Sequence, residues 1–262
     1  MQLPTKIKKA SVVEPRLMVI FAHTKIGKTS NLAQLPNALV VDLEDGADYY
    51  DCMSINVKKE ALEEGVSPLK TLLTIPKMIQ KANQDNGGVP VYDFIILDTT
   101  SALEDMAASL ALFRYKQTPI GKNFTEDSIL KLSQGAGYHW LRLGFEELLD
   151  PFKGLAKKCV ILSAHVKNAT INKRGEDLVA KDINLTGKLK QIVCSEADCI
   201  AYMYRNAKDK CNMLSFISEE QDLCSGSRQV YLSGKEFVIS KRSDNGELTT
   251  YWEEIFPSIK QK

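Results

Sequence analysis

The stretch from Leu17 to Ser30, LMVIFAHTKIGKTS, constrains the fold of this chain more than any other part of the sequence. An apolar run is followed by a loop that closes on Gly27, Lys28 and Thr29. This order is typical of a buried strand, a phosphate-binding loop (P-loop) and the start of a helix, where backbone N–H groups surround phosphate oxygens. In such a loop the lysine reaches the β- and γ-phosphates of a nucleotide, and the threonine hydroxyl binds Mg²⁺. The predicted nucleotide-binding residues are Ala22, His23, Thr24, Lys25, Ile26, Gly27, Lys28, Thr29 and Ser30.

One position of the loop departs from the common pattern G-x-x-x-x-G-K-[ST]. Ala22 stands where the first glycine is expected. Alanine is small enough to leave the turn possible, but it lacks the free access of glycine to positive φ angles. The substitution therefore bears on nucleotide affinity rather than on where the site lies.

A second landmark is the apolar run FIILD, which ends in Asp98 and is followed by hydroxyl residues. An aspartate at the carboxyl end of a buried strand is typical of a Walker B motif, in which it orients water on Mg²⁺. Thr29 and Asp98 are therefore the predicted metal ligands. The chain between Lys28 and Asp98 leaves room for two crossover units, which allows the two strands to be neighbours in a doubly wound sheet.

Two more buried strands are expected to end at the same edge of the sheet. The run ALVVD leads into an acidic segment that contains Asp42, Glu44 and Asp45, and CVILSAH ends in His165. Continuous apolar runs suit strands covered on both faces of a parallel sheet. Ligands of open α/β sheets bind at the carboxyl ends of the strands, so these polar residues are expected to converge on one site.

Length and composition favour one α/β domain. The 262 residues are 44% hydrophobic and 26% charged, as in ordinary globular proteins. We expect a short basic arm at residues 1–16 and one domain at 17–262. The expected fold is a doubly wound, mainly parallel sheet with antiparallel strands towards the C-terminus, because the last strands alternate polar and apolar residues.

Net charge, hydrophobic runs and cysteine content bear on partners, location and metal binding. With 34 basic and 33 acidic residues, the net charge of +1 creates no global field for a polyanionic partner. No apolar run suits a signal peptide or a membrane span, so the chain is expected to be cytoplasmic. The six cysteines form no C-x-x-C pair and are expected to be reduced thiols, although a zinc site among the last four stays open as a minor alternative.

The segment from Val166 to Lys190 is locally basic, with six basic and three acidic residues. We interpret it as a polar loop that follows the strand ending in His165. It contains no aromatic residue on which a base could stack, so contacts to nucleic acid would read mainly the phosphate backbone. A solvated connector is the alternative. The basic residues of this segment are Lys167, Lys173, Arg174, Lys181, Lys188 and Lys190.

The ordered set AHTKIGKTS, VVDLEDGAD, FIILDTTSALE and CVILSAH resembles the RecA-like P-loop ATPases. The nearest group by this resemblance is the phage-type RecA-like nucleotide-binding proteins, which include single-strand annealing recombinases. Such proteins bind ATP and Mg²⁺, assemble as rings or filaments, and act on single-stranded DNA, in some cases with a single-strand binding protein as partner.

The resemblance also implies roles for individual residues. Glu44 matches the glutamate that activates the attacking water, although Asp42 and Asp45 compete for this role. His165 falls at the position of a polar sensor of the γ-phosphate. Lys241 and Arg242 resemble basic residues that reach the nucleotide of a neighbouring subunit, although a solvated basic turn is equally compatible with KRSDNG.

Three functions are compatible with these features. The first is an oligomeric ATPase that binds single-stranded DNA and promotes recombination or annealing. The second is a nucleotide-dependent binding module that regulates or loads a partner on DNA. The third, a small-molecule phosphotransferase, is the weakest, because the sequence lacks an arginine-rich lid for a second phosphorylated substrate.

Overall fold

The computed structural model describes residues 13–173, 176–218 and 224–260, so most of the predicted basic arm lies outside it. Its centre is a mixed β-sheet in the order β11-β10-β8-β7-β1-β5-β4-β2-β3, with β6 paired to β5 and β9 paired to β7. In chain order the strands are β1 (Leu17–Ala22), β2 (Ala38–Asp42), β3 (Met53–Asn56), β4 (Phe94–Asp98), β5 (Cys159–Lys173), β6 (Glu176–Ile183), β7 (Cys199–Asn206), β8 (Cys211–Ser215), β9 (Gly226–Ser227), β10 (Glu236–Arg242) and β11 (Leu248–Thr250).

The fold class predicted from the sequence is confirmed. Strands β3, β2, β4, β5, β1 and β7 are parallel, whereas β8, β10 and β11 continue the sheet in antiparallel pairs. One detail of strand order is wrong in the prediction, because β1 and β4 are not neighbours. β5 lies between them and pairs with both. The polar ends of β1, β5, β4 and β2 therefore stand side by side.

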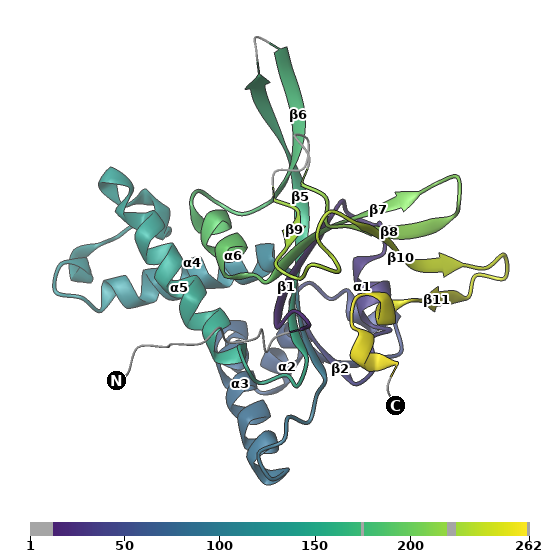
Figure 1. Ribbon diagram of the computed structural model, residues 1–262. Coiled ribbons are helices and arrows are strands. Elements are labelled where there is room, and N and C mark those ends of the chain that lie inside the picture. Colours follow the sequence, from purple (N-terminus) through teal and green to yellow (C-terminus); the bar gives the residue numbers. More distant parts are fainter. Residues whose placement is uncertain (1–12, 174–175, 219–223, 261–262) are drawn as a thin grey trace, which may run out of the picture.

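Helices cover both faces of the sheet (Figure 1). The α-helices are α1 (Lys28–Leu32), α2 (Val57–Glu63), α3 (Pro68–Asp85), α4 (Thr100–Lys116), α5 (Ala136–Leu149) and α6 (Leu189–Glu196). The short 3-10 helices are η1 (Ala47–Tyr49), η2 (Gly121–Asn123), η3 (Ile129–Lys131), η4 (Ser133–Gly135), η5 (Asp150–Phe152), η6 (Trp252–Glu254) and η7 (Pro257–Ile259).

Two hydrophobic cores follow from the alternation of side chains along the strands. The odd-numbered residues of β1 join the core under α3, α4, α5 and α6, and the even-numbered residues join the core under α1 and the C-terminal segment. Trp252 fixes the second core to the P-loop helix, because its indole Nε1 donates to the backbone oxygen of Asn31 at 2.9 Å. Burial of β1 on both faces holds the start of the P-loop in place.

Most of the segment from Val166 to Lys190 is strand rather than loop, which corrects the prediction. β5 continues past His165 and pairs with β6 in an antiparallel ladder from Val166↔Ile183 to Lys173↔Glu176. This β5–β6 hairpin projects away from the sheet as a long ribbon (Figure 1). Ladder hydrogen bonds satisfy peptide groups without a buried face, so a polar composition did not exclude strands.

The first described residues pack against the end of the chain. The carboxylate of Glu14 accepts hydrogen bonds from the backbone N–H and the hydroxyl of Ser258, at 2.6 and 2.7 Å. Within residues 13–173, 176–218 and 224–260, no helix is both long and apolar enough to cross a membrane.

Candidate functional site

The P-loop is held by Gly27 at the start of α1. Gly27 has a φ of 101°, and a Cβ at this position would lie 3.0 Å from the hydroxyl of Ser30, so a side chain would be strained and crowded. Its carbonyl oxygen accepts hydrogen bonds from Ser30 Oγ at 2.9 Å and Asn31 Nδ2 at 2.6 Å. The glycine of G-K-T is therefore required by the conformation of the turn.

The structure explains why alanine is tolerated at the first P-loop position. Ala22 is the last residue of β1 and pairs with His165 on one side and Met203 on the other. The positive φ angles of the loop fall on Lys25, at 62°, and on Gly27. Ala22 thus occupies extended backbone, where it needs none of the conformational freedom of glycine.

Thr29 and Asp98, the predicted metal ligands, are in direct contact. The Thr29 hydroxyl donates to Asp98 Oδ2 at 2.6 Å. Asp98 is 4% exposed, and its Oδ1 has no hydrogen-bond partner among the described residues. A buried carboxylate oxygen without a partner, beside a hydroxyl, suits a hard cation such as Mg²⁺, which prefers oxygen ligands and keeps several waters. The residues therefore fit a Mg²⁺ ion that a nucleotide would bring.

Asp42 builds the turn that positions the neighbouring acid. Its buried carboxylate accepts three backbone N–H groups, from Glu44 at 3.0 Å, Gly46 at 3.2 Å and Ala47 at 2.7 Å. Asp45 has a φ of 64° and turns its carboxylate to Lys58 and Asn56, each at 2.9 Å. Asp42 and Asp45 are thus engaged in holding the loop.

Glu44 instead faces the P-loop and is held from two strands. Its Oε1 accepts the hydroxyl of Thr99 at 2.6 Å, and its Oε2 lies 3.3 Å from His165 Nε2. The other ring nitrogen, Nδ1, lies 3.2 Å from Lys28 Nζ. An ammonium group only donates, so Nδ1 accepts and Nε2 carries the proton that is donated to Glu44. Lys28, His165, Glu44 and Thr99 therefore form one chain of hydrogen bonds.

This chain of hydrogen bonds sets the charge states of the site. The hydrogen bond from His165 is the largest influence that lowers the pKa of Glu44, with Thr99 and the charge of Lys28 adding to it against partial burial. Burial lowers the pKa of Lys28, and the charges of Asp98 and Glu44 oppose that effect. Glu44 is therefore a carboxylate at neutral pH, and a bound phosphate would favour the charged form of Lys28.

These groups open onto one hollow, which we call the phosphate cleft, with a volume of about 630 Å³. Its walls come from the P-loop, the turn after β2, and the ends of β4 and β5. Tyr49, 83% exposed, stands at its border. The lining residues are Thr24, Lys25, Gly27, Lys28, Thr29, Glu44, Asp45, Gly46, Tyr49, Tyr50, Asp98, Thr99 and His165.

The other predicted P-loop residues lie outside this cleft. The exposed His23 ring makes a T-shaped contact with the ring of Tyr202, with centroids 6.5 Å apart. Ile26 and Ser30 line a second cavity, of about 470 Å³, which meets the phosphate cleft at Gly27.

Lys241 and Arg242, at the end of β10, are exposed and are separated from each other by the alternation of the strand. Arg242 lines the second cavity and donates from Nη1 to the backbone oxygen of Gly246 at 2.6 Å. Lys241 lines neither cavity. The structure does not bring this pair together with Glu44 and His165.

The predicted DNA-contacting residues are distributed along the β5–β6 hairpin and the start of α6. Three of them contact their own chain: Lys167 donates to the Leu185 oxygen at 2.8 Å, Lys190 pairs with Asp182 at 2.8 Å, and Lys181 lies 4.4 Å from the Tyr202 ring centroid. Lys188 is exposed just before α6. Lys173 ends β5, and Arg174 lies outside the described residues.

Among the lining residues that were not singled out from the sequence, two bear on the chemistry of the hollows. Thr99 holds Glu44, and its place directly after Asp98 in LDTTS is a signal that could have been used. Arg205 lines the second cavity from β7, and nothing in YRNAKDK marks it, because the contact depends on a strand far from the P-loop in sequence.

Comparison with known proteins finds a family whose model covers most of the chain. Residues 14–243 match the model of a family described as AAA domain. No curated protein matches. Among solved structures, an ATPase from the type III secretion system of pathogenic bacteria is similar at 12% identity and a TM-score of 0.43, covering 78% of this chain and 62% of its own. The RadB recombinase is similar at 12% identity and a TM-score of 0.41, covering 91% and 92%.

Proposed function

We infer that this chain, which belongs to the AAA domain family, binds ATP with Mg²⁺ in the phosphate cleft and hydrolyses it. The observation that carries this inference is the convergence of a buried lysine, a hydroxyl and carboxylate pair, and a second carboxylate in one cleft. Binding alone would need only the lysine and the first pair. A separate, ionised glutamate on the far wall gives the site a group that can accept a proton from water.

Each residue has a role that follows from its contacts. Lys28 neutralises charge on the β- and γ-phosphates, and Thr29 and Asp98 hold the Mg²⁺ ion or its waters. When bound, the ion would neutralise the charge that develops on the phosphate oxygens. Glu44 accepts a proton from the attacking water, because it is the carboxylate of the acidic turn that faces the P-loop.

His165 is our candidate for the sensor of the γ-phosphate. It shares hydrogen bonds with both Lys28 and Glu44, so a phosphate that recruits the lysine removes the donor to Nδ1. His165 lies on β5, which continues without a break into the β5–β6 hairpin. In this proposal a change at the phosphate reaches the β5–β6 hairpin along that strand.

This continuity supports single-stranded DNA as the second ligand. Exposed lysines after the hairpin, such as Lys188, suit contacts to a phosphate backbone, and recombination or annealing would use such a coupling. The alternative is a nucleotide-dependent binding module that loads a replication or recombination partner. Membership of the phage-type RecA-like group, and a single-strand binding protein as partner, stay predictions.

We also propose that the protein works as a homo-oligomer, a ring or a filament. Lys241 is exposed and lines neither hollow of its own chain, which leaves it available to a neighbouring subunit. Its contribution in trans would make hydrolysis depend on assembly.

The test is phosphate release by the full chain with Mg²⁺ and ATP, with and without single-stranded oligonucleotide. Asp98→Asn should keep much of the nucleotide binding and lose hydrolysis, because the amide weakens the metal shell. Asp85→Asn, an exposed acid at the end of α3, is the matched control. Absence of ATP binding by the parent chain contradicts the proposal. An equal rate of ATP hydrolysis with and without single-stranded oligonucleotide favours the nucleotide-dependent binding module.

A further inference from the structure

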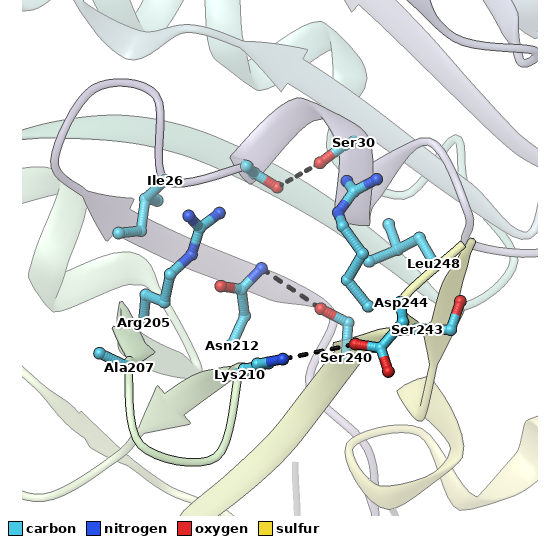
Figure 2. Close-up of a pocket in the computed structure, with 12 residues that line it drawn as sticks. Ile26, Ser30, Arg205, Ala207, Lys210, Asn212, Ser240, Ser243, Asp244 and Leu248 are labelled. Atoms are coloured by element: carbon cyan, nitrogen blue, oxygen red, sulfur yellow. Dashed lines mark hydrogen bonds and ion pairs between the residues drawn. The ribbon is translucent and has the colours of Figure 1, made fainter. Parts of the chain in front are cut away.

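The second cavity is built from three segments that are distant in sequence. The P-loop supplies Ile26, Gly27 and Ser30, and two β-hairpins, β7–β8 and β10–β11, supply the remaining walls. Figure 2 shows Arg205 and Asn212 projecting from β7 and β8, with Ser30 across the cavity. The two hairpins are joined by the pairing of β8 with β10, which fixes the base of the cavity. At this base Asn212 Nδ2 donates a hydrogen bond to Ser240 Oγ at 3.3 Å.

The charges in this cavity are not balanced. Its lining includes three basic residues and one acid, and Lys210 pairs with Asp244 at 3.3 Å. The described residues supply no acidic partner for Arg205 or Arg242; the contact given for Arg242 is to a neutral carbonyl. Two guanidinium groups without counter-charges favour an anionic ligand, and arginine binds phosphate in a bidentate fashion.

The position of the cavity beside the P-loop indicates which part of a bound nucleotide it could receive. Gly27 lines both hollows, Lys28 and Thr29 line the phosphate cleft, and Ser30 lines the cavity. A triphosphate with its terminal phosphate near Glu44 and His165 therefore runs past Gly27 towards the cavity. The end that arrives there is the α-phosphate with its ribose.

We propose that this cavity holds the α-phosphate and ribose of a nucleotide bound to the same chain, with Arg205 and Arg242 as its ligands, so that the chain accepts nucleoside triphosphates with little regard to the base. The proposal rests on the proposed function, since it needs a nucleotide on the P-loop. It assigns Arg242 to its own subunit rather than to a neighbour. None of the residues that line the cavity is aromatic. Binding through charge, with at most guanidinium stacking, tolerates every base.

The experiment measures Mg²⁺-dependent binding of ATP, GTP, CTP and UTP, and of inorganic tripolyphosphate, which lacks a nucleoside. The four nucleotides should bind within about threefold of one another, since the recognition is of charge. Arg205→Ala and Arg242→Ala should each weaken nucleotide binding about tenfold, the loss expected for a charge-assisted hydrogen bond, and should change tripolyphosphate binding about twofold or less. Arg242→Lys should restore part of the loss, because it keeps the charge without the fork.

Lys208→Ala is the matched control, because Lys208 lies at the tip of the same β7–β8 hairpin and lines neither hollow.

A mixture of Lys28→Ala chains with Arg205→Ala/Arg242→Ala chains should bind no better than its components, because both groups act in one chain. Restoration by mixing overturns the assignment to the same subunit. Unchanged nucleotide binding by both arginine variants overturns the site while leaving the P-loop function intact. A preference above about tenfold for one base overturns the charge-based recognition. A parent chain that binds tripolyphosphate and no nucleotide overturns the cavity, and one that binds neither overturns the proposed function as well.

Discussion

The phosphate cleft and the β5–β6 hairpin are both polar, but their side chains are organised in different ways. In the cleft the residues that carry chemistry hold one another: Lys28 reaches His165, His165 reaches Glu44, and Thr29 reaches Asp98. On the hairpin and at α6, lysines such as Lys167 and Lys190 are held by their own backbone or by an acid. The proposed hydrolysis needs such mutual contact among chemically different groups, whereas binding to a phosphate backbone needs only separate basic residues.

This contrast predicts that the largest effect comes from the centre of the cleft. Lys28→Ala should abolish ATP binding, because it removes the ammonium that faces the phosphates and also breaks the contact to His165. Isothermal titration with Mg²⁺–ATP measures the loss. The melting temperature should change little, since Lys28 contributes no apolar packing to the core. A folded variant with parental ATP affinity would contradict the P-loop site.

The next effect separates catalysis from binding. Glu44→Gln should bind ATP and reduce hydrolysis by about a hundredfold or more, because the amide keeps the shape and cannot accept a proton. Asp45→Asn is the matched variant, since Asp45 is one residue away and faces Lys58. Single-turnover phosphate release distinguishes them. If Asp45→Asn stalls and Glu44→Gln does not, the proton acceptor is the other acid.

The pH dependence should show the shifted pKa of Lys28. Burial lowers that pKa below the ordinary 10.5, and bound phosphate favours the charged form. ATP affinity should therefore fall as the pH rises through the lowered value, earlier than for an ordinary lysine. The unliganded fold should gain stability over the same interval, because the unfolded chain binds the proton more tightly there. Titration from pH 7 upwards follows the ATP affinity of the parent, and Lys28→Met should remove the trend in stability, measured by melting over the same range. Identical profiles for parent and variant would count against the shift.

The smallest effects are expected at the lysines around the start of α6, just after the β5–β6 hairpin. Lys188→Ala should weaken single-stranded DNA binding by a similar factor on unrelated sequences and reduce the salt slope by about 0.7, the value for one phosphate contact. Lys190→Ala should change the slope less, because Lys190 is already paired with Asp182. Fluorescence anisotropy at several salt concentrations measures both. Equal slopes for parent and Lys188→Ala would remove this residue from the DNA surface.

The sequence by itself determined the elements whose signals are local. Each core strand is a continuous apolar run that ends in a polar group, so Lys28, Asp98 and His165 could be assigned to one edge of a parallel sheet before the strand order was known. Gly27 and Thr29 followed from the same short motif. These inferences succeed because a buried strand and the turn after it are specified within about ten residues.

Tertiary structure decided which residues meet. Our proposal of Glu44 rather than Asp42 or Asp45 as the proton acceptor rests on three backbone N–H groups around Asp42 and on the left-handed conformation of Asp45. The position of β5 between β1 and β4 depends on how the crossover helices pack, which no single segment encodes. Arg205 lies beside the P-loop because β7 pairs with β1. Contacts between strands that are distant in sequence depend on the whole sheet, so no local sequence pattern predicts them.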